Sequence, residues 1–148
     1  FDLNFSNLVF EDKNIRYHEN DWMLNPLTIK DPKKTLVYFD DHVSQGQRIN
    51  EAHKLGIKNI ILDDNLPIHT LHGDGLPPVP TVDIIMDKKI KDCQQIKWVS
   101  EEQSFTYVHD FKFCEQVRNK IETIYKLPSI KSETGYALET VLTCVRLR

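Results

Sequence analysis

The sequence lacks the features that would assign it at once to a membrane, nucleic-acid-binding or secreted class. Its apolar runs are far shorter than the roughly 20 residues that span a bilayer, so we expect no membrane segment. The formal net charge is −3 and nothing in the sequence indicates a basic face, so we expect no nucleic-acid partner. There is no initiator methionine and no signal-peptide pattern. With 40% hydrophobic and 28% charged residues, the composition is that of an ordinary soluble globular protein.

Cysteine is also scarce. Cys93, Cys114 and Cys144 are odd in number and widely spaced, and no two of them form a C-x-x-C pair. We therefore expect reduced, mostly buried thiols instead of a disulfide framework or a zinc site. Reduced thiols favour an intracellular, cytoplasmic location.

The length and the order of the expected elements indicate a single α/β domain over residues 1–148. Phe1 already lies in a strand-like run, which predicts that this sequence is an internal piece of a longer protein. The expected strands cover residues 1–3, 15–18, 36–39, 57–62 and 138–147, and the expected helices cover residues 44–55 and 111–125. Gly56 suits the end of the first helix. Helical spacing continues over residues 82–90, and residues 100–103 resemble a helix start.

Residues 66–80 form the longest expected loop. This segment contains four of the seven prolines and two of the five glycines. Loops of this length in a compact domain are usually functional or disordered, so we expect a lid over the site that closes when a ligand binds.

Two expected strands, at residues 36–39 and 57–62, each end in three side chains of types that bind ligands. These six residues are Asp40, Asp41, His42, Asp63, Asp64 and Asn65. The strands are joined by one helix, so parallel pairing would bring both groups to the same edge of the sheet, where ligands bind in open α/β folds. Asp and Asn also begin turns for purely local reasons, so strand-end turn chemistry is the alternative.

These two strands and their polar ends resemble the fourth and fifth strands of the class I S-adenosylmethionine-dependent methyltransferase fold. The similarity is greatest to the metal-dependent O-methyltransferases of the catechol and sugar-modifying types. The resemblance implies a Rossmann-like, mostly parallel sheet with flanking helices. It also implies a magnesium or manganese ion bound by Asp41, Asp64 and Asn65, with Asp40 and Asp63 as close alternates.

The first part of the sequence fits the same family. Asp2 follows a segment that resembles the second strand, whose terminal acidic residue binds the cofactor ribose. Asp21 matches an acidic residue beside the adenine, and Trp22 is placed to stack on that base. Asp40 is assigned to the cofactor as well. The first strand and its glycine-rich loop would precede Phe1, so the resemblance implies a sheet without its first strand in this chain.

The resemblance also assigns the chemistry, with one departure. Catechol-type members have a lysine base three residues after the metal-binding Asp, and Ser44 stands at that position here. His42 would then remove the acceptor proton, with Asp41 beside it, or the metal alone would lower the pKa of the acceptor hydroxyl. The acceptor implied by the family is a sugar or other small polar hydroxyl compound. His69, His72 and Asp74 in the long loop are candidates to lie near it.

Two other interpretations compete with this one. The strand ending in Asp63 is also similar to the central motif of DHH-type manganese phosphoesterases, although Asp64 and Asn65 stand where those enzymes have Asp-His-His. The second alternative is a non-catalytic methyltransferase-like module that binds a partner. The sequence does not predict an oligomeric state.

Overall fold

The computed structural model describes residues 11–24, 29–73, 76–100, 102–128 and 142–148. By their internal contacts, residues 1–30 form one compact unit and residues 31–148 form another, and each unit is described by itself. The strand predicted over residues 1–3 and the cofactor role predicted for Asp2 concern residues outside the described part of the chain. No helix of the described part of the chain is both long and apolar enough to span a membrane.

The described residues of the larger unit form a four-stranded sheet, a two-stranded sheet, three α-helices and two short 3-10 helices. Its strands are β1 (Leu36–Phe39), β2 (Asn59–Leu62), β3 (Gln95–Ser100), β4 (Gln103–Val108), β5 (Ile121–Lys126) and β6 (Thr143–Leu147). Its helices are η2 (Pro32–Lys34), α1 (Gln45–Lys54), η3 (Ile68–Gly73), α2 (Val82–Met86) and α3 (Phe111–Arg118). The fold is therefore α/β, as expected from the sequence.

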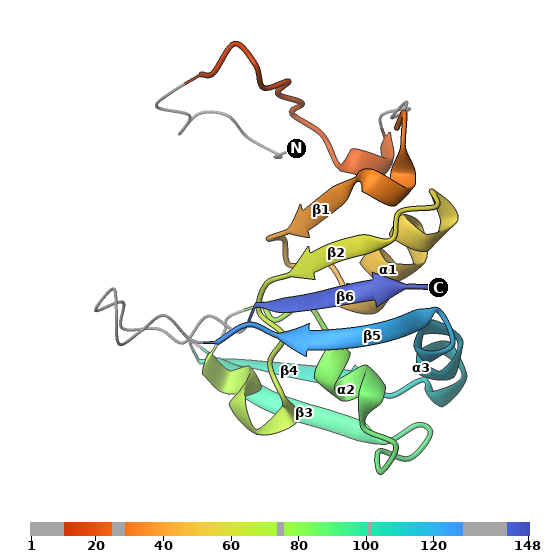
Figure 1. Ribbon diagram of the computed structural model, residues 1–148. Coiled ribbons are helices and arrows are strands. Elements are labelled where there is room, and N and C mark those ends of the chain that lie inside the picture. Colours follow the sequence, from red (N-terminus) through yellow and green to blue (C-terminus); the bar gives the residue numbers. More distant parts are fainter. Residues whose placement is uncertain (1–10, 25–28, 74–75, 101, 129–141) are drawn as a thin grey trace. The chain divides into compact units, whose positions relative to one another are not determined.

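The four-stranded sheet has the order β1-β2-β6-β5. β1 pairs with β2 in parallel, whereas β6 is antiparallel to both β2 and β5. In Figure 1 the arrows of β1, β2 and β5 accordingly point one way and that of β6 points the other. The sheet is thus mixed, which corrects the expectation of mostly parallel pairing. The antiparallel pairing of β5 and β6 continues just beyond the two strands, where Leu127 N donates to Leu142 O (2.9 Å).

The unit β1-α1-β2 matches the prediction closely. α1 begins after Ser44, whose hydroxyl accepts a hydrogen bond from Gln47 N as an N-cap. It ends at Lys54 and is followed by Gly56, whose φ of +76° is a backbone conformation that glycine adopts without strain. Leu36 then pairs with Asn59 and Phe39 with Leu62, so both strands end at the same level.

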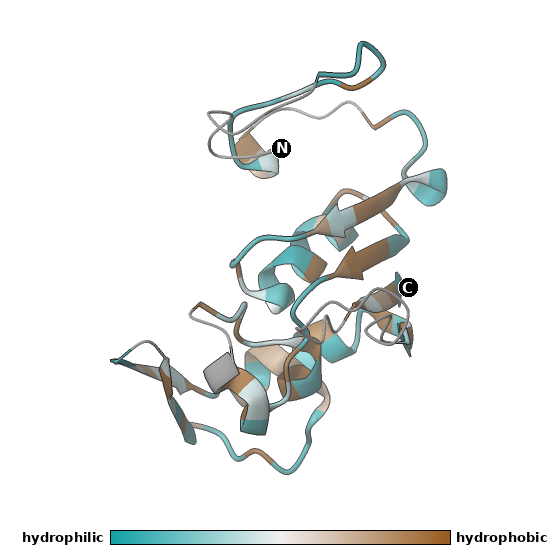
Figure 2. Cartoon of the chain, turned by 90° about the vertical axis from the view of Figure 1, so that its left-hand side faces the viewer, coloured by the Kyte–Doolittle hydropathy of each residue, from teal (hydrophilic) through white to brown (hydrophobic). Residues whose placement is uncertain are grey.

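One face of the four-stranded sheet is buried against the helices, and the other is open. Every second residue of β2 and β6, such as Ile60 and Val145, is almost fully buried. The helices contribute Ile49, Ala52, Ile85, Cys114 and Val117 to this core. Figures 1 and 2 show α1, α2 and α3 together on one side of the strands. On the other side Leu36, Tyr38 and Tyr125 are more than half exposed.

A second, smaller core joins the two-stranded sheet to the rest of the unit. β3 and β4 are antiparallel, and Ser100 pairs with Gln103 across their turn. Residues 100–103 therefore connect two strands and do not start a helix, and Glu102 has a φ of +66°. The buried residues of this core are Leu71, Ile84, Ile90 and Ile96.

Three other sequence expectations need correction. The helix expected over residues 111–125 ends at Arg118, and β5 begins at Ile121, because a turn at Asn119 and Lys120 interrupts it. The helix expected over residues 82–90 ends at Met86. In the smaller unit, residues 15–18 form no strand. Ile15 is 56% exposed there, and the first helix from residue 11 onward is η1 (Trp22–Leu24).

The segment at residues 66–80 is better anchored than its composition indicated. Leu71 in η3 is fully buried, and Leu66 and Val79 pack against the smaller core. Thr81 Oγ1 also donates to Leu66 O at 2.7 Å. These apolar contacts on both sides of residues 74–75 give the lid hypothesis no support.

Candidate functional site

The candidate site lies where β1 and β2 end. Because the strands are parallel and in register at Phe39 and Leu62, residues 40–42 and 63–65 leave the sheet at the same edge. A hydrogen bond from Asp63 N to Phe39 O, at 3.0 Å, continues the pairing beyond the strands. The predicted convergence of the two polar groups at one edge is therefore confirmed, and we call this region the carboxyl edge.

Asp41 is held by an arginine of α1. Arg48 Nε and a terminal nitrogen both lie 2.9 Å from Asp41 Oδ2, while Oδ1 accepts a hydrogen bond from Val43 N at 3.2 Å. The Arg48 side chain is only 4% exposed, and it also pairs with Glu51 at 2.7 Å. Its guanidinium lies 5.5 Å from the centre of the Phe39 ring. The protein itself thus orients Asp41, and Asp41 shares the single positive charge of Arg48 with Glu51.

Asp63 is held in a similar way from the strand beside it. The Tyr38 hydroxyl donates to Asp63 Oδ2 at 2.7 Å, and Asp64 N donates to Oδ1 at 2.8 Å. Partial burial and then the hydrogen bond and charge of Asp63 raise the pKa of Tyr38, so this hydroxyl keeps its proton. On the main chain, Gln45 Nε2 donates to Asp63 O at 2.5 Å.

Asn65 is fully buried and ties three elements together. Its Oδ1 accepts a hydrogen bond from Asp83 N at 2.8 Å, in the first turn of α2. Its Nδ2 donates to Thr143 Oγ1 of β6 at 2.8 Å and to Asp83 Oδ1 at 3.2 Å. Asp83 is itself paired with Lys126 at 2.6 Å. The amide thus has partners on both of its polar atoms and fixes the end of β2 against α2 and β6.

His42 is exposed and oriented by one contact. Its Nδ1 lies 2.6 Å from Leu76 O. A carbonyl oxygen only accepts hydrogen bonds, so Nδ1 carries the proton, and in the neutral ring Nε2 holds the free lone pair. This is the arrangement of a histidine that accepts a proton at Nε2 while its other nitrogen is fixed by a hydrogen bond.

Asp40 lies next to His42 and is exposed. Partial burial and then the negative charge of Asp63 raise the pKa of Asp40, whereas the nearby His42 opposes this shift. Residual repulsion between carboxylates therefore persists at the carboxyl edge, although Arg48 and Tyr38 already compensate Asp41 and Asp63.

The protein itself already engages most of the oxygen atoms that were predicted to bind a divalent cation. Both carboxylate oxygens of Asp41 and of Asp63, and the amide oxygen of Asn65, already accept hydrogen bonds from protein groups. Asp64 is half-buried and has a φ of +52°. Among the residues that are described, no group of three or more His, Cys, Asp or Glu side chains could hold a metal ion. The magnesium or manganese ion stays a prediction from the resemblance.

The residues assigned to the cofactor are only partly described. Asp21 Oδ1 accepts a hydrogen bond from Met23 N at 2.8 Å, which is an ordinary turn contact at the start of η1. Trp22 is only 5% exposed, so it offers little ring surface for stacking on a base. His69 is exposed, while the side chain of His72 and all of Asp74 lie outside the described residues.

Sequence reasoning missed the residues that hold the carboxylates and the amide. These are Tyr38, Gln45, Arg48, Asp83 and Thr143. Arg48 alone carried a signal, because it lies in α1 next to Ile49 and one turn before Ala52, both fully buried. A comparison of the chain with protein-family models, with curated proteins and with solved structures gave no significant match.

Proposed function

We propose that this chain is part of an S-adenosylmethionine-dependent O-methyltransferase that acts on a sugar or other small polar hydroxyl compound. The observation that carries the proposal is the oriented imidazole of His42 at the edge where β1 and β2 end together. An acceptor hydroxyl bound at this edge would give its proton to His42 Nε2, while Leu76 O holds the opposite side of the ring.

The order of the strands supports this proposal. In the class I methyltransferase fold the last strand runs against the others and lies between the fifth and sixth strands. Here β6 follows β5 in the sequence and lies antiparallel between β2 and β5. With β1 and β2 as the fourth and fifth strands, the order β1-β2-β6-β5 corresponds to the second half of that sheet.

The roles of the residues follow from their contacts. Arg48 and Tyr38 keep Asp41 and Asp63 in place, so the carboxyl edge has a fixed shape before a ligand arrives. His42 removes a proton from the acceptor as the methyl group is transferred. When bound, S-adenosylmethionine supplies an electrophilic methyl group, and we assign Asp2 and Asp40 to hold it. No step of this proposal needs a divalent cation. The three free cysteines are consistent with an intracellular location, which we also propose.

The test is transfer of an isotopically labelled methyl group from S-adenosylmethionine to a panel of sugars and small hydroxyl compounds. His42→Asn keeps a side-chain N–H for Leu76 O but removes the proton acceptor, so we expect kcat to fall about 100-fold with little change in KM. His53→Asn, near the far end of α1, is the matched control and should keep full activity.

Two outcomes would separate the competing functions. Activity that survives a chelator is expected from the donor contacts, and its complete loss in chelator with recovery on added magnesium would restore the metal hypothesis. A chain that binds S-adenosylhomocysteine in calorimetry but methylates none of the acceptors would favour the non-catalytic module. Manganese-dependent cleavage of a phosphodiester would favour the phosphoesterase.

A further inference from the structure

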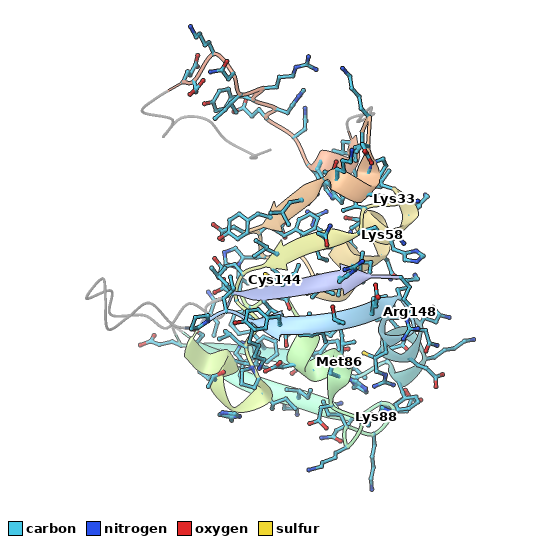
Figure 3. The ribbon with its side chains drawn as sticks, viewed as in Figure 1. Lys33, Lys58, Met86, Lys88, Cys144 and Arg148 are labelled. Carbon is cyan, nitrogen blue, oxygen red and sulfur yellow. The ribbon has the colours of Figure 1, made fainter. Side chains whose placement is uncertain are left out.

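The opposite end of the same sheet carries a basic pocket of about 370 Å³. It lies where β2 begins and β6 ends, with contributions from η2 and from the start of β5. The residues that line it are Lys33, Lys58, Asn59, Glu122, Arg146, Leu147 and Arg148. Four of these side chains are cationic and one is anionic, in a chain whose formal net charge is −3. Figure 3 shows Lys33, Lys58 and Arg148 at this end of the ribbon.

The strand pairing explains why these cations lie together. Arg146 is the antiparallel partner of Asn59, and Leu147 N donates to Lys58 O at 2.8 Å, so the end of β6 lies beside the start of β2. Arg146 and Arg148 are two residues apart in an extended chain and therefore project to the same side. Pro32 of η2 lies close to Gly56, which brings Lys33 to the turn before β2.

Contacts within the protein orient the two arginines but do not involve all of their hydrogen-bond donors. Arg148 Nε donates to Ile121 O at 2.9 Å, which anchors the guanidinium and leaves its two terminal nitrogens for a ligand. Arg146 Nε pairs with Glu122 at 3.1 Å, and both side chains of this pair are about half exposed. Neither Lys33 nor Lys58 has a side-chain hydrogen bond or ion pair within the described part of the chain. Among the described residues, the pocket therefore has more hydrogen-bond donors than there are protein acceptors to pair with them.

The same positive charges affect the pKa of a neighbouring histidine. Partial burial, followed by the charges of Lys120 and Lys58, lowers the pKa of His53. The positive charge thus extends from the pocket toward the last turn of α1, where His53 lies.

We propose that this pocket binds the phosphate group of a phosphorylated small molecule. A phosphate monoester carries about −1.5 to −2 charges at neutral pH, more than a sulfate ester or a single carboxylate, and so matches an excess of cations best. Guanidinium groups with free terminal nitrogens bind its oxygens in pairs, and lysines add point charges. A volume of about 370 Å³ lies in the range of small-molecule pockets.

This site is distinct from the carboxyl edge and does not depend on the proposed methyl transfer. Lys58 and Asp63 lie five residues apart along one extended segment, which places them about 16 Å from each other. A failure of the methyltransferase proposal would leave the phosphate site standing, and the reverse is also true, because the two tests use different ligands and variants.

The experiment is a titration of the full chain with inorganic phosphate, followed by amide shifts in NMR spectra at constant ionic strength. We expect saturable shifts at Lys58, Asn59 and Arg148, and tighter binding of glucose 6-phosphate than of glucose. Glucose 6-sulfate, titrated in parallel, should bind more weakly than glucose 6-phosphate, because its ester group carries one negative charge and not nearly two. Stronger binding of the sulfate ester would overturn the choice of phosphate.

Two double variants test whether phosphate binds in this pocket. The double variant Lys33→Gln with Lys58→Gln should weaken phosphate binding about tenfold, as expected from the loss of two charge-assisted contacts. The matched control, Lys88→Gln with Lys89→Gln, removes the same charge from two exposed lysines outside the pocket, and Figure 3 shows Lys88 well away from it. Its phosphate affinity should change less than twofold. Equal losses in the two double variants, or no saturable shift near Lys58, would refute the site.

Discussion

The two ends of the four-stranded sheet carry opposite charges, and they differ in whether the charged side chains have hydrogen-bond partners in the protein. At the carboxyl edge, Asp41 and Asp63 are each held by two protein donors, and Asn65 is buried in a network that joins β2, α2 and β6. At the basic pocket, Lys33 and Lys58 have no such partners among the described residues. A cluster of like charges is therefore not by itself a binding site, because the surrounding donors and acceptors decide which charged groups remain available to a ligand.

The largest difference between the two ends should appear at two asparagines, one at the start of β2 and one three residues after its end. Asn65→Ala removes a fully buried amide and leaves Asp83 N and Thr143 Oγ1 without their partner, so it should lower the free energy of unfolding by about 3 kcal/mol. Asn59→Ala, at an exposed position of the basic pocket, should change it by less than about 0.5 kcal/mol. Urea denaturation of both variants measures this. Equal effects would contradict the structural role of Asn65.

The next difference concerns two arginine–carboxylate pairs, one at each end. Asp41→Asn leaves the guanidinium of Arg48, only 4% exposed, with Glu51 as its remaining carboxylate partner. Because Asp41 is itself 34% exposed, we expect a loss of about 1–2 kcal/mol, below the range for a fully buried pair. Glu122→Gln breaks the exposed pair with Arg146 and should cost less than about 0.5 kcal/mol.

The same urea measurements carry an internal control for this pair. Adding salt to 0.5 M should reduce the small effect of Glu122→Gln further, since exposed charges are screened, and should leave that of Asp41→Asn largely unchanged. If the two substitutions were equally costly and equally sensitive to salt, Asp41 would belong to the surface and not to a fixed edge.

The smallest expected effects are on proton binding. Burial and Asp63 raise the pKa of Asp40, so its contribution to stability falls as the pH rises from the ordinary aspartate pKa to the raised one. Burial and the charges of Lys120 and Lys58 lower the pKa of His53, so its contribution falls as the pH drops below the ordinary histidine pKa. NMR titration should show a lower Asp40 pKa in Asp63→Asn and a higher His53 pKa in Lys58→Gln. Unchanged values would remove like-charge repulsion as a cause at that end.

The fold was predictable where local signals and packing agree. The apolar run of β1, the N-cap at Ser44 and the glycine after α1 fixed the β1-α1-β2 unit. Prediction failed over residues 111–125, because Val117 and Ile121 have helical spacing although a turn and a strand follow Arg118. In this segment the pairing of β5 with β6, which is distant in the sequence, decides the structure and not the local spacing of apolar residues.

The candidate site was predictable only in part, for a related reason. The six strand-end residues could be located from the sequence, because parallel pairing follows from a strand-helix-strand order. The residues that hold them could not be located in this way. Tyr38 and Asp63 come into contact only through the strand pairing, and Asn65 contacts Thr143, which lies 78 positions away in the sequence. The basic pocket was not expected at all. Its cations come from three separate segments, so no cluster of lysine and arginine appears in the sequence.

The central claim is that His42 presents an unprotonated Nε2 at the carboxyl edge because its Nδ1 donates to Leu76 O. A long-range ¹⁵N–¹H correlation spectrum of the chain, recorded on the neutral ring, identifies which nitrogen carries the proton. We expect Nδ1 of His42 to be protonated and Nε2 to have the chemical shift of a free lone pair. A His42 ring protonated at Nε2, or one that averages between both tautomers as a histidine in water does, would remove the proposed base from the site.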